Sequence, residues 1–222
     1  MIAPGRIEAV RIGQVARLDG AGRGGKGVST AFAKMPVAGP VAVGPLGLAG
    51  DSQGNLKVHG GPEKAVYAYP LSGYTGWRAE FPELAMRPGA MGENLLVADL
   101  DEQSVHIGDI VRIGTALLQV SQIREPCSTL AAIHGTTRIV RAMTRSGRCG
   151  WYFRVLESGA IAAGDAHAII ERPNPGWPVA RFAAFAAGRS GTIEALTELA
   201  TLPGLTPAWQ ARARAALAAQ RG

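Results

Sequence analysis

Seven short runs of apolar or alternating residues, separated by glycines, occupy the first 171 residues and limit the folds open to this chain. They are Ile7 to Val15, Ala65 to Tyr69, Leu95 to Val97, Ile110 to Ile113, Ala116 to Ile123, Tyr152 to Leu156 and Ala168 to Ile170. Many short strands joined by tight turns are typical of a β-barrel. The turns are marked by Gly50-Asp51, Gly108-Asp109 and Gly164-Asp165, where glycine supplies a positive φ and aspartate bonds to nearby amides. We therefore predict a mostly β, barrel-type fold.

Helical periodicity is rare in this region and dominant after it. It is confined to Ser72 to Glu80, Ser128 to His134 and Thr137 to Arg145 until three prolines in seven residues, Arg172 to Pro178, interrupt the chain. Alanine and leucine then predominate, which predicts three short helices at Val179 to Ala187, Thr192 to Ala200 and Pro207 to Gln220. We expect a barrel domain over residues 1–172 and a small all-α domain over 173–222, which either covers a substrate or partner site or stabilises the barrel.

One cysteine, Cys127, follows the alternating run Ala116 to Ile123 in the polar turn Arg124-Glu125-Pro126-Cys127-Ser128. A thiol at a strand exit, beside a cation and before a short helix, is well placed as a metal ligand or a nucleophile. The other cysteine, Cys149, precedes Gly150-Trp151 and is predicted to pack in the core.

Two further polar segments are candidates for a site. Lys57 and His59 share one face of a short extended segment, and Gly60 and Gly61 free backbone amides, so this stretch suits an anion such as a phosphate. The other reading, a histidine that satisfies a turn, stays open. Asn94 offers two donors and an acceptor at the mouth of a strand. For His106, His134 and His167, surface or packing roles are the simpler prediction.

Cysteine spacing and hydropathy indicate the cellular compartment of the protein. The two cysteines fit neither a zinc pattern nor a CxxC motif, which favours a reducing compartment. The N-terminus has no apolar signal core, and the longest uncharged stretch, Met35 to Gly50, is broken by prolines. We expect a cytoplasmic protein without a membrane span.

The formal net charge of +6 comes from scattered basic residues. The densest set, Arg138, Arg141, Arg145 and Arg148, would line one helical face, either steering an anion or forming a solvated surface. Nucleic-acid binding is not expected, because no aromatic side chains interleave with these arginines.

Six fragments, taken in order, carry a family resemblance. They are Gly47-Leu48-Ala49-Gly50-Asp51, Val58-His59-Gly60-Gly61-Pro62-Glu63-Lys64-Ala65, Gly92-Glu93-Asn94-Leu95, Ile107-Gly108-Asp109, Pro126-Cys127 and Gly150-Trp151. Together they resemble the MOSC domain, named for the C-terminal domain of the molybdenum-cofactor sulfurases. The match is closest to its stand-alone bacterial branch, whose similar members end in a three-helix extension. The resemblance spans about residues 7–220.

This resemblance implies a β-barrel that binds a molybdenum–pterin cofactor (Mo-molybdopterin), with Cys127 as the protein ligand to the metal. The cofactor contacts it implies, read together with the polar segments above, are Lys57, His59, Gly60, Gly61, Glu93, Asn94, Arg124 and Cys127. A thiolate suits a transition metal, and cations with exposed amides suit the pterin's phosphate.

Members of this branch are associated with reducing N-hydroxylated compounds, including hydroxylamino base analogues, to amines. On that model His59 or Asn94 orients the substrate or donates a proton. The chain shows no nucleotide, flavin or iron–sulfur motif, so we expect a separate electron-donating reductase as partner. Two departures leave the substrate open: Thr129 stands where similar sequences often have lysine, and residues 53–55 lack an expected acidic residue.

Two alternatives to this reading stay open. Cys127 could carry a persulfide for sulfur transfer, activated by Arg124 and the helix that follows. Alternatively, the protein is a non-catalytic binding module in which Cys127 is an ordinary half-buried thiol.

Overall fold

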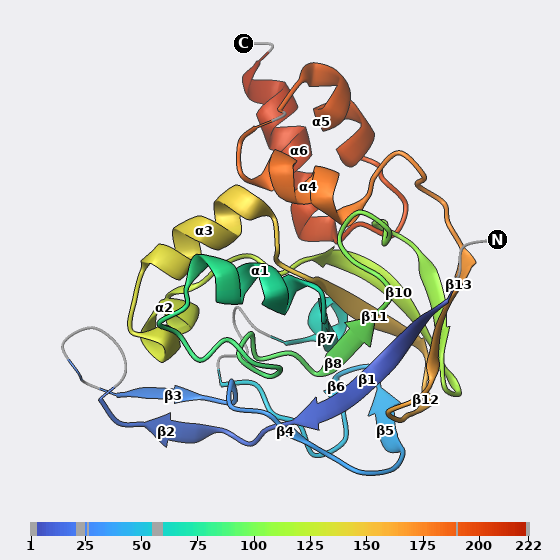
Figure 1. The fold of residues 1–222 in the computed structure, drawn as a ribbon. Coiled ribbons are helices and arrows are strands. Elements are labelled where there is room, and N and C mark those ends of the chain that lie inside the picture. The colour runs from blue at the N-terminus through green and yellow to red at the C-terminus, as the bar shows by residue number, and fades with distance from the viewer. Residues whose placement is uncertain (1–3, 21–24, 26, 55–59, 190, 221–222) are drawn as a thin grey trace.

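The fold is described from a computed structural model that covers residues 4–20, 25, 27–54, 60–189 and 191–220. Seven of the described strands close into a barrel in the order β13-β9-β10-β11-β7-β8-β1, with β1 pairing back to β13 (Figure 1). Their bounds are β1 (Gly5–Ile12), β7 (Val66–Pro70), β8 (Leu95–Ala98), β9 (Ile110–Ile113), β10 (Ala116–Ile123), β11 (Trp151–Glu157) and β13 (Ala166–Glu171). The predicted barrel is therefore confirmed.

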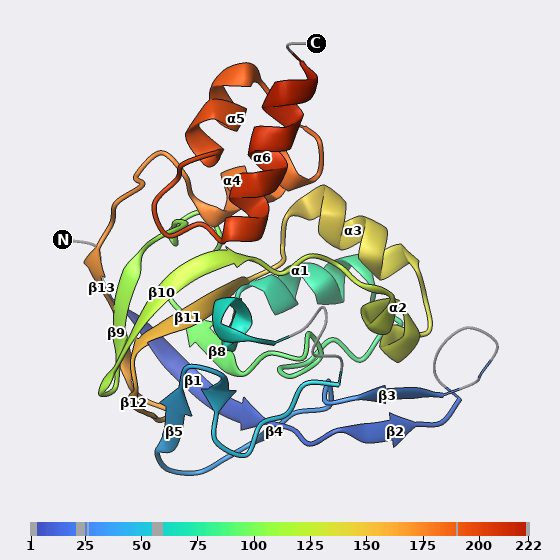
Figure 2. The same ribbon diagram turned by 180° about the vertical axis from the view of Figure 1, so that it is seen from behind.

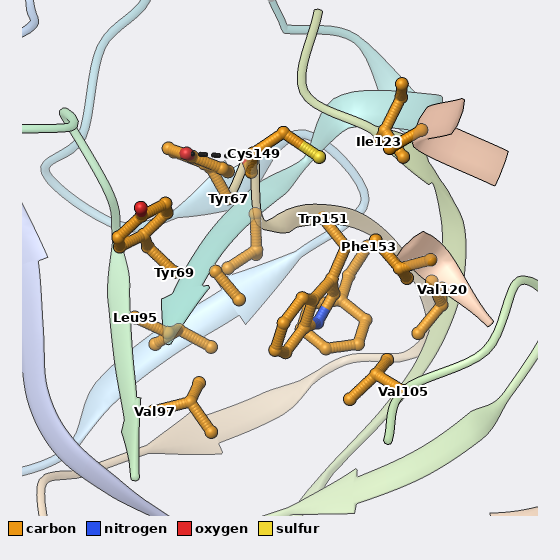
Figure 3. Packing of buried hydrophobic residues seen from close by; sticks show 14 of the residues in the cluster. Tyr67, Tyr69, Leu95, Val97, Val105, Val120, Ile123, Cys149, Trp151 and Phe153 are labelled. Atoms are coloured by element: carbon orange, nitrogen blue, oxygen red, sulfur yellow. Dashed lines mark hydrogen bonds between the residues drawn. The ribbon is translucent and has the colours of Figure 1, made fainter. Parts of the chain in front are cut away.

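The barrel interior explains why the strand sequences are so apolar. Trp151 and Phe153 of β11 are fully buried and pack with Val120 and Val105 inside the barrel (Figure 3). β7 and β8 are buried along their whole length and pair in parallel, whereas the other barrel pairs are antiparallel. Parallel strands are covered on both faces, and continuous apolar runs are what such strands require.

The three Gly-Asp turns behave in two ways. Gly50, Gly108 and Gly164 all adopt positive φ, as predicted. Asp109 and Asp165 accept hydrogen bonds from the backbone amides of His106 (3.0 Å) and Ala162 (2.8 Å), which stabilises their own turns. The carboxylate of Asp51 instead accepts from the amide of Gly13 at 2.8 Å, 38 residues away. Asp51 is thus directed out of its turn.

Shorter strands lie outside the barrel, and the sequence did not signal them. β2 (Ala16–Leu18) and β3 (Val28–Thr30) form a two-stranded ribbon that extends away from the barrel (Figure 2). β4 (Met35–Pro36) pairs with β1, and β5 (Val41–Gly44) lies between β6 (Gly47–Leu48) and β12 (Gly159–Ile161). The predicted strand from Ile7 to Val15 ends earlier than expected, at Ile12.

Three helices lie on one side of the barrel, at or near their predicted places. They are α1 (Gly73–Glu80), α2 (Ser128–His134) and α3 (Arg138–Ser146). The proline-rich segment follows β13, and α4 (Val179–Ala186), α5 (Ile193–Leu199) and α6 (Pro207–Ala219) then form the helical tail. No described helix has the length and apolar character needed to cross a membrane.

The helical tail is joined to the barrel by a shared core and by backbone hydrogen bonds. Phe182 and Trp209 belong to the same buried cluster as Phe153. The amide of Val179 donates to the Val105 carbonyl at 2.9 Å, and that of Thr206 donates to Ser121 at 3.2 Å. These contacts give the tail a stabilising role, which is one of the two roles the sequence left open.

One buried histidine makes stability depend on pH. His167 is fully buried against Trp151 and Phe153, and neither ring nitrogen has a hydrogen-bond partner among the described residues. Burial lowers the pKa of His167 from 6.5 to about 4. The unfolded chain therefore takes up a proton below pH 6.5 that the folded protein does not. The contribution of the neutral, buried His167 to the free energy of unfolding is fully present above pH 6.5 and is lost as the pH falls towards 4.

We predict that this histidine removes roughly 3 kcal/mol of unfolding free energy between pH 7 and pH 4. Urea unfolding of the wild type and of His167→Gln across this range would measure it. The variant should show the shallower loss of stability with falling pH. Parallel curves for the two proteins would contradict the prediction.

Candidate functional site

A pocket of about 100 Å³ opens beside Cys127, between the end of β3, the Asp51 turn and the start of α2. Its described lining is Ser29, Thr30, Ala31, Phe32, Lys34, Asp51, Ser52, Gln53, Gly54, Gly60, Lys64, Ala65, Tyr67, Met91, Gly92, Asn94, Arg124, Cys127, Thr129 and Tyr152. The lining thus brings together the predicted residues Gly60, Asn94, Arg124 and Cys127, although the sequence separates the first and the last by 67 residues (127 − 60). None of the described lining residues belongs to the helical tail.

Cys127 occupies the N-cap position of α2, with an extended backbone at φ −133° and ψ 166°. Pro126 before it is incompatible with a continuing strand interior, so the chain turns between β10 and α2. The thiol is half-buried and lines the pocket. Cys127 is therefore accessible from the pocket while its backbone is fixed by the helix start.

Arg124 is the most unusual charge in the site. It is only 4% exposed, and its guanidinium makes no ion pair with any described carboxylate. One nitrogen, Nη2, lies 3.8 Å from Cys127 Sγ, and Nη1 lies 3.7 Å from Met143 Sδ. Arginine stays protonated in proteins, and burying a charge without a counter-ion is costly. This position therefore favours an anion at Cys127 or in the pocket.

Aromatic rings surround the Arg124 guanidinium. It lies 5.8 Å from the ring centroid of Phe32 and 5.5 Å from that of Tyr67, both in cation–π range. Tyr67 also packs on Tyr152, with centroids 5.2 Å apart. Burial raises the pKa of both tyrosines, although the arginine opposes the shift, so they stay neutral. The rings thus hold the cation without neutralising it.

A second cation, Lys34, is held by Asp51 in the pocket wall. Their side chains are 8% and 3% exposed, and Lys34 Nζ donates to Asp51 Oδ1. Asp51 Oδ2 also accepts from Asn94 Nδ2 at 2.8 Å. Burial lowers the pKa of Lys34, and the neighbouring Asp51 carboxylate opposes that shift. Lys34 and Asp51 form a buried ion pair facing the pocket.

Asn94 lines the pocket, but its side chain is fully engaged with the protein. Its Oδ1 accepts from the Tyr67 amide at 3.1 Å, and its Nδ2 donates to the Arg11 carbonyl and to Asp51. These bonds link β1 and β7 to the residue that precedes β8. The geometry gives Asn94 a positioning role toward Asp51, and its predicted role toward the substrate stays a prediction.

The other predicted contacts are distributed unevenly. Gly60 lines the pocket, whereas Gly61 precedes the short 3-10 helix Pro62–Lys64 and is not among the lining residues. Glu93 is fully buried outside the lining, where it accepts from the Tyr74 hydroxyl at 2.8 Å, and burial raises its pKa. Lys57 and His59 lie outside the described residues.

The sequence reasoning missed five lining residues that the geometry makes prominent: Phe32, Lys34, Lys64, Tyr67 and Tyr152. Lys64 lies in one of the six family fragments, for which no role of this lysine is predicted, and the sequence predicts Asp51 only as a turn residue. Lys34 is a charged residue within the apolar stretch around Phe32, and this pattern in the sequence could have indicated a buried functional lysine. The tyrosines, by contrast, read as ordinary strand residues.

Cys149, His106 and His134 make contacts that agree with the packing roles predicted for them. Cys149 is 3% exposed, burial raises its thiol pKa well above the ordinary value, and its carbonyl accepts from Tyr67 Oη at 2.9 Å (Figure 3). His134 Nε2 lies 2.8 Å from the Ala90 carbonyl oxygen, and His106 Nδ1 lies 3.3 Å from that of Ser104. Burial lowers the pKa of both.

The described residues offer few protein ligands for a metal ion. Among its residues, no group of three or more histidine, cysteine, aspartate or glutamate side chains lies together in a way that could hold a metal ion. A single thiol beside a cation therefore fits a metal that brings most of its own ligands better than a bare ion.

The chain is similar to several known proteins. The family model for the MOSC domain matches residues 55–167. YflK of Bacillus subtilis is 40% identical over 152 residues, 68% of each chain, and YiiM of Escherichia coli is 41% identical over 150 residues, 66% of each. A protein named Reductase from Gibberella moniliformis is 36% identical over 203 residues, which is 90% of this chain but only 35% of that protein.

Solved structures show the same fold. The crystal structure of YiiM from Geobacillus stearothermophilus superimposes with a TM-score of 0.80 at 31% identity, covering 96% of this chain and all of the other. YiiM from Escherichia coli gives a TM-score of 0.76 at 28% identity, covering 97% and 94%. The similarity to these two structures includes the helical tail, because it covers nearly the whole chain.

Proposed function

Because this chain belongs to the MOSC domain family, we propose that its pocket binds a molybdenum–pterin cofactor with Cys127 as metal ligand, and that the protein reduces N-hydroxylated compounds to amines. The observation that carries this proposal is the Cys127 thiol lining a pocket beside a buried guanidinium without a carboxylate partner among the described residues. The family is one associated with molybdenum-cofactor binding, and the name Reductase belongs to a relative.

The residues present fit such a group. Cys127 would supply the thiolate ligand, and Arg124 and Lys64 would face its anionic parts. When bound, the molybdenum centre supplies the two-electron redox chemistry that breaks an N–O bond. Phe32, Tyr67 and Tyr152 hold Arg124 in place and keep water from its flank.

The proposed reaction consumes two protons as well as two electrons: R–NHOH + 2e⁻ + 2H⁺ gives R–NH₂ + H₂O. Lys34 and Lys64 both line the pocket, and burial lowers the pKa of each; Lys34 is the one that Asp51 holds in the pocket wall. We assign Lys34 as the proton donor toward the departing oxygen. Asn94 and the Gly13 amide fix Asp51, so the donor is preorganised.

The electrons come from a separate donor on this proposal. The fungal Reductase carries 65% of its length outside the part similar to this chain (100% − 35%). A chain of this kind is therefore found within a longer reductase, which supports a partner that supplies electrons. That the partner is a separate reductase and the substrate an N-hydroxylated compound is part of the same proposal.

Turnover with a small reductant tests the proposed function directly. Protein co-expressed with a complete cofactor-synthesis pathway would be supplied with reduced riboflavin and an N-hydroxylated adenine, and the amine product would be quantified. Cys127→Ser should lower the rate by more than about 100-fold, the upper range for groups that merely support a metal ligand. Cys149→Ser is the matched control and should keep most activity, because Cys149 lies outside the described pocket lining. Equal rates for Cys127→Ser and the wild type would overturn the proposal.

A further inference from the structure

A groove of about 350 Å³ lies on the far side of α3 from Arg124, and the chemistry described so far does not use it. Its described lining is Val140, Arg141, Thr144, Arg145, Ala187 and Arg189. Two apolar side chains and three arginines thus share one concave surface between α3 and the end of α4. Arginine beside apolar surface is typical of protein interfaces.

Three of the four arginines predicted on one helical face pair with carboxylates at or just after the end of α1, although α3 ends at Ser146 and Arg148 therefore lies beyond it. Arg145 and Arg148 both pair with Glu80, the former at 2.5 Å, and Arg138 pairs with Glu83 at 3.1 Å. Arg189 is also occupied, since it donates to the carbonyl oxygens of Arg145 and Thr144 at the C-terminus of α3. These contacts fix the walls of the groove.

Arg141 is the exception in this row. Its side chain is exposed, and its guanidinium makes no hydrogen bond or ion pair with any residue that the structure describes. The described lining of the groove holds three arginines and no carboxylate, a charge of +3 (3 − 0), although Arg145 also pairs with Glu80. The face is therefore suited to an anionic partner.

The groove is also close to the candidate metal ligand. The buried side of α3 presents Met143, whose Sδ lies 3.7 Å from Arg124 Nη1, and Arg124 Nη2 lies 3.8 Å from Cys127 Sγ. Only the width of one helix, about 10 Å, separates the two sides of α3. Electron transfer slows steeply with distance, and a donor seated in the groove would leave the pocket open for substrate.

We propose that this groove, which we call the α3–α4 groove, is the docking surface for a small acidic electron-transfer protein. The inference rests on the proposed function, because it names where the electron donor binds. Opposite charge would steer such a donor to Arg141 and Arg189, and Val140 and Ala187 would provide the apolar contact. A nucleic acid is the less suitable partner, because no aromatic side chain is among the described residues that line the groove.

The test uses a plant-type [2Fe–2S] ferredoxin as the acidic probe. Calorimetric titration of the cofactor-free protein should show binding at low ionic strength that weakens steeply as salt is added. Arg141→Glu should raise the dissociation constant by at least about tenfold. Arg112→Glu, on β9, changes the net charge equally outside the groove and is the matched control.

Each outcome decides the proposal. Weaker binding for Arg141→Glu alone supports it. Absence of binding by the wild type, equal loss in Arg112→Glu, or tighter binding of a single-stranded oligonucleotide at the same groove would overturn it. Turnover driven by reduced riboflavin distinguishes a failure of the docking proposal from a failure of the proposed function. Arg141→Glu should keep this activity, whereas a failure of the proposed function would remove it from the wild type as well.

Discussion

Replacing Asp51 with alanine is expected to destabilise the protein by about 3–5 kcal/mol, because it leaves the buried Lys34 ammonium without its partner. The backbone amide of Gly13 and the side-chain amide of Asn94 would each lose a hydrogen-bond acceptor at the same time. Chemical denaturation at neutral pH would measure the loss of unfolding free energy.

Two further variants make this result specific. Asp19→Ala removes an aspartate that pairs with Arg17 at the surface, where the side chains are 85% and 62% exposed, and should cost less than about 0.5 kcal/mol. The double variant Lys34→Met/Asp51→Leu removes both charges and should recover much of the stability. If Asp51→Ala costs no more than Asp19→Ala, the buried ion pair does not hold the pocket wall.

Replacing Arg124 with methionine is expected to separate stability from function. Methionine fills a similar space between Phe32 and Tyr67, and the change removes a buried charge that has no described counter-ion, so the folded protein should be at least as stable as the wild type. Cofactor retention should nevertheless fall by more than about 100-fold, since a charge-assisted contact in a buried pocket is lost.

Thermal unfolding and the pterin content of purified protein would measure the two effects. Arg124→Lys keeps the charge but loses the planar fork and should restore retention only in part. Unchanged pterin content in Arg124→Met would show that this cation serves the fold and not the ligand. A large loss of stability would contradict the interpretation of Arg124 as an uncompensated charge.

The barrel was predictable because its strands are long enough to show their pattern. The run Ala116 to Ile123 alternates, pairs on both sides and appears as β10 at the predicted bounds. The three tail helices were found for the same reason, since alanine-rich periodic segments follow a clear proline signal. By contrast, β4 and β6 have two residues each, and strands so short are specified by their pairing partners.

The site was only partly predictable, because its side chains come from segments that the topology alone unites. Cys127 and Arg124 lie in one polar turn, where residue type was informative. The role of Lys34 depends on its ion pair with Asp51, which lies 17 residues away. The sequence predicts Asp51 only as a turn residue. Asn94 had the right location, but only the structure shows that its hydrogen bonds are already used.

The same limit applies to the arginine row. Spacing placed Arg138, Arg141, Arg145 and Arg148 on one helix and left open whether they steer an anion or face solvent. The structure shows that three of them pair with Glu80 or Glu83. Those carboxylates are 55 to 68 residues distant, so no local pattern reveals them.

Metal content of the purified protein tests the central claim most directly. Wild type, Cys127→Ala and Cys149→Ala would be co-expressed with a complete cofactor-synthesis pathway and analysed for molybdenum by mass spectrometry and for pterin by fluorescence. The account predicts near-stoichiometric molybdenum and pterin in the wild type and in Cys149→Ala, and loss of molybdenum in Cys127→Ala. A well-folded wild type without either component, or a Cys127→Ala variant that keeps its molybdenum, would contradict it.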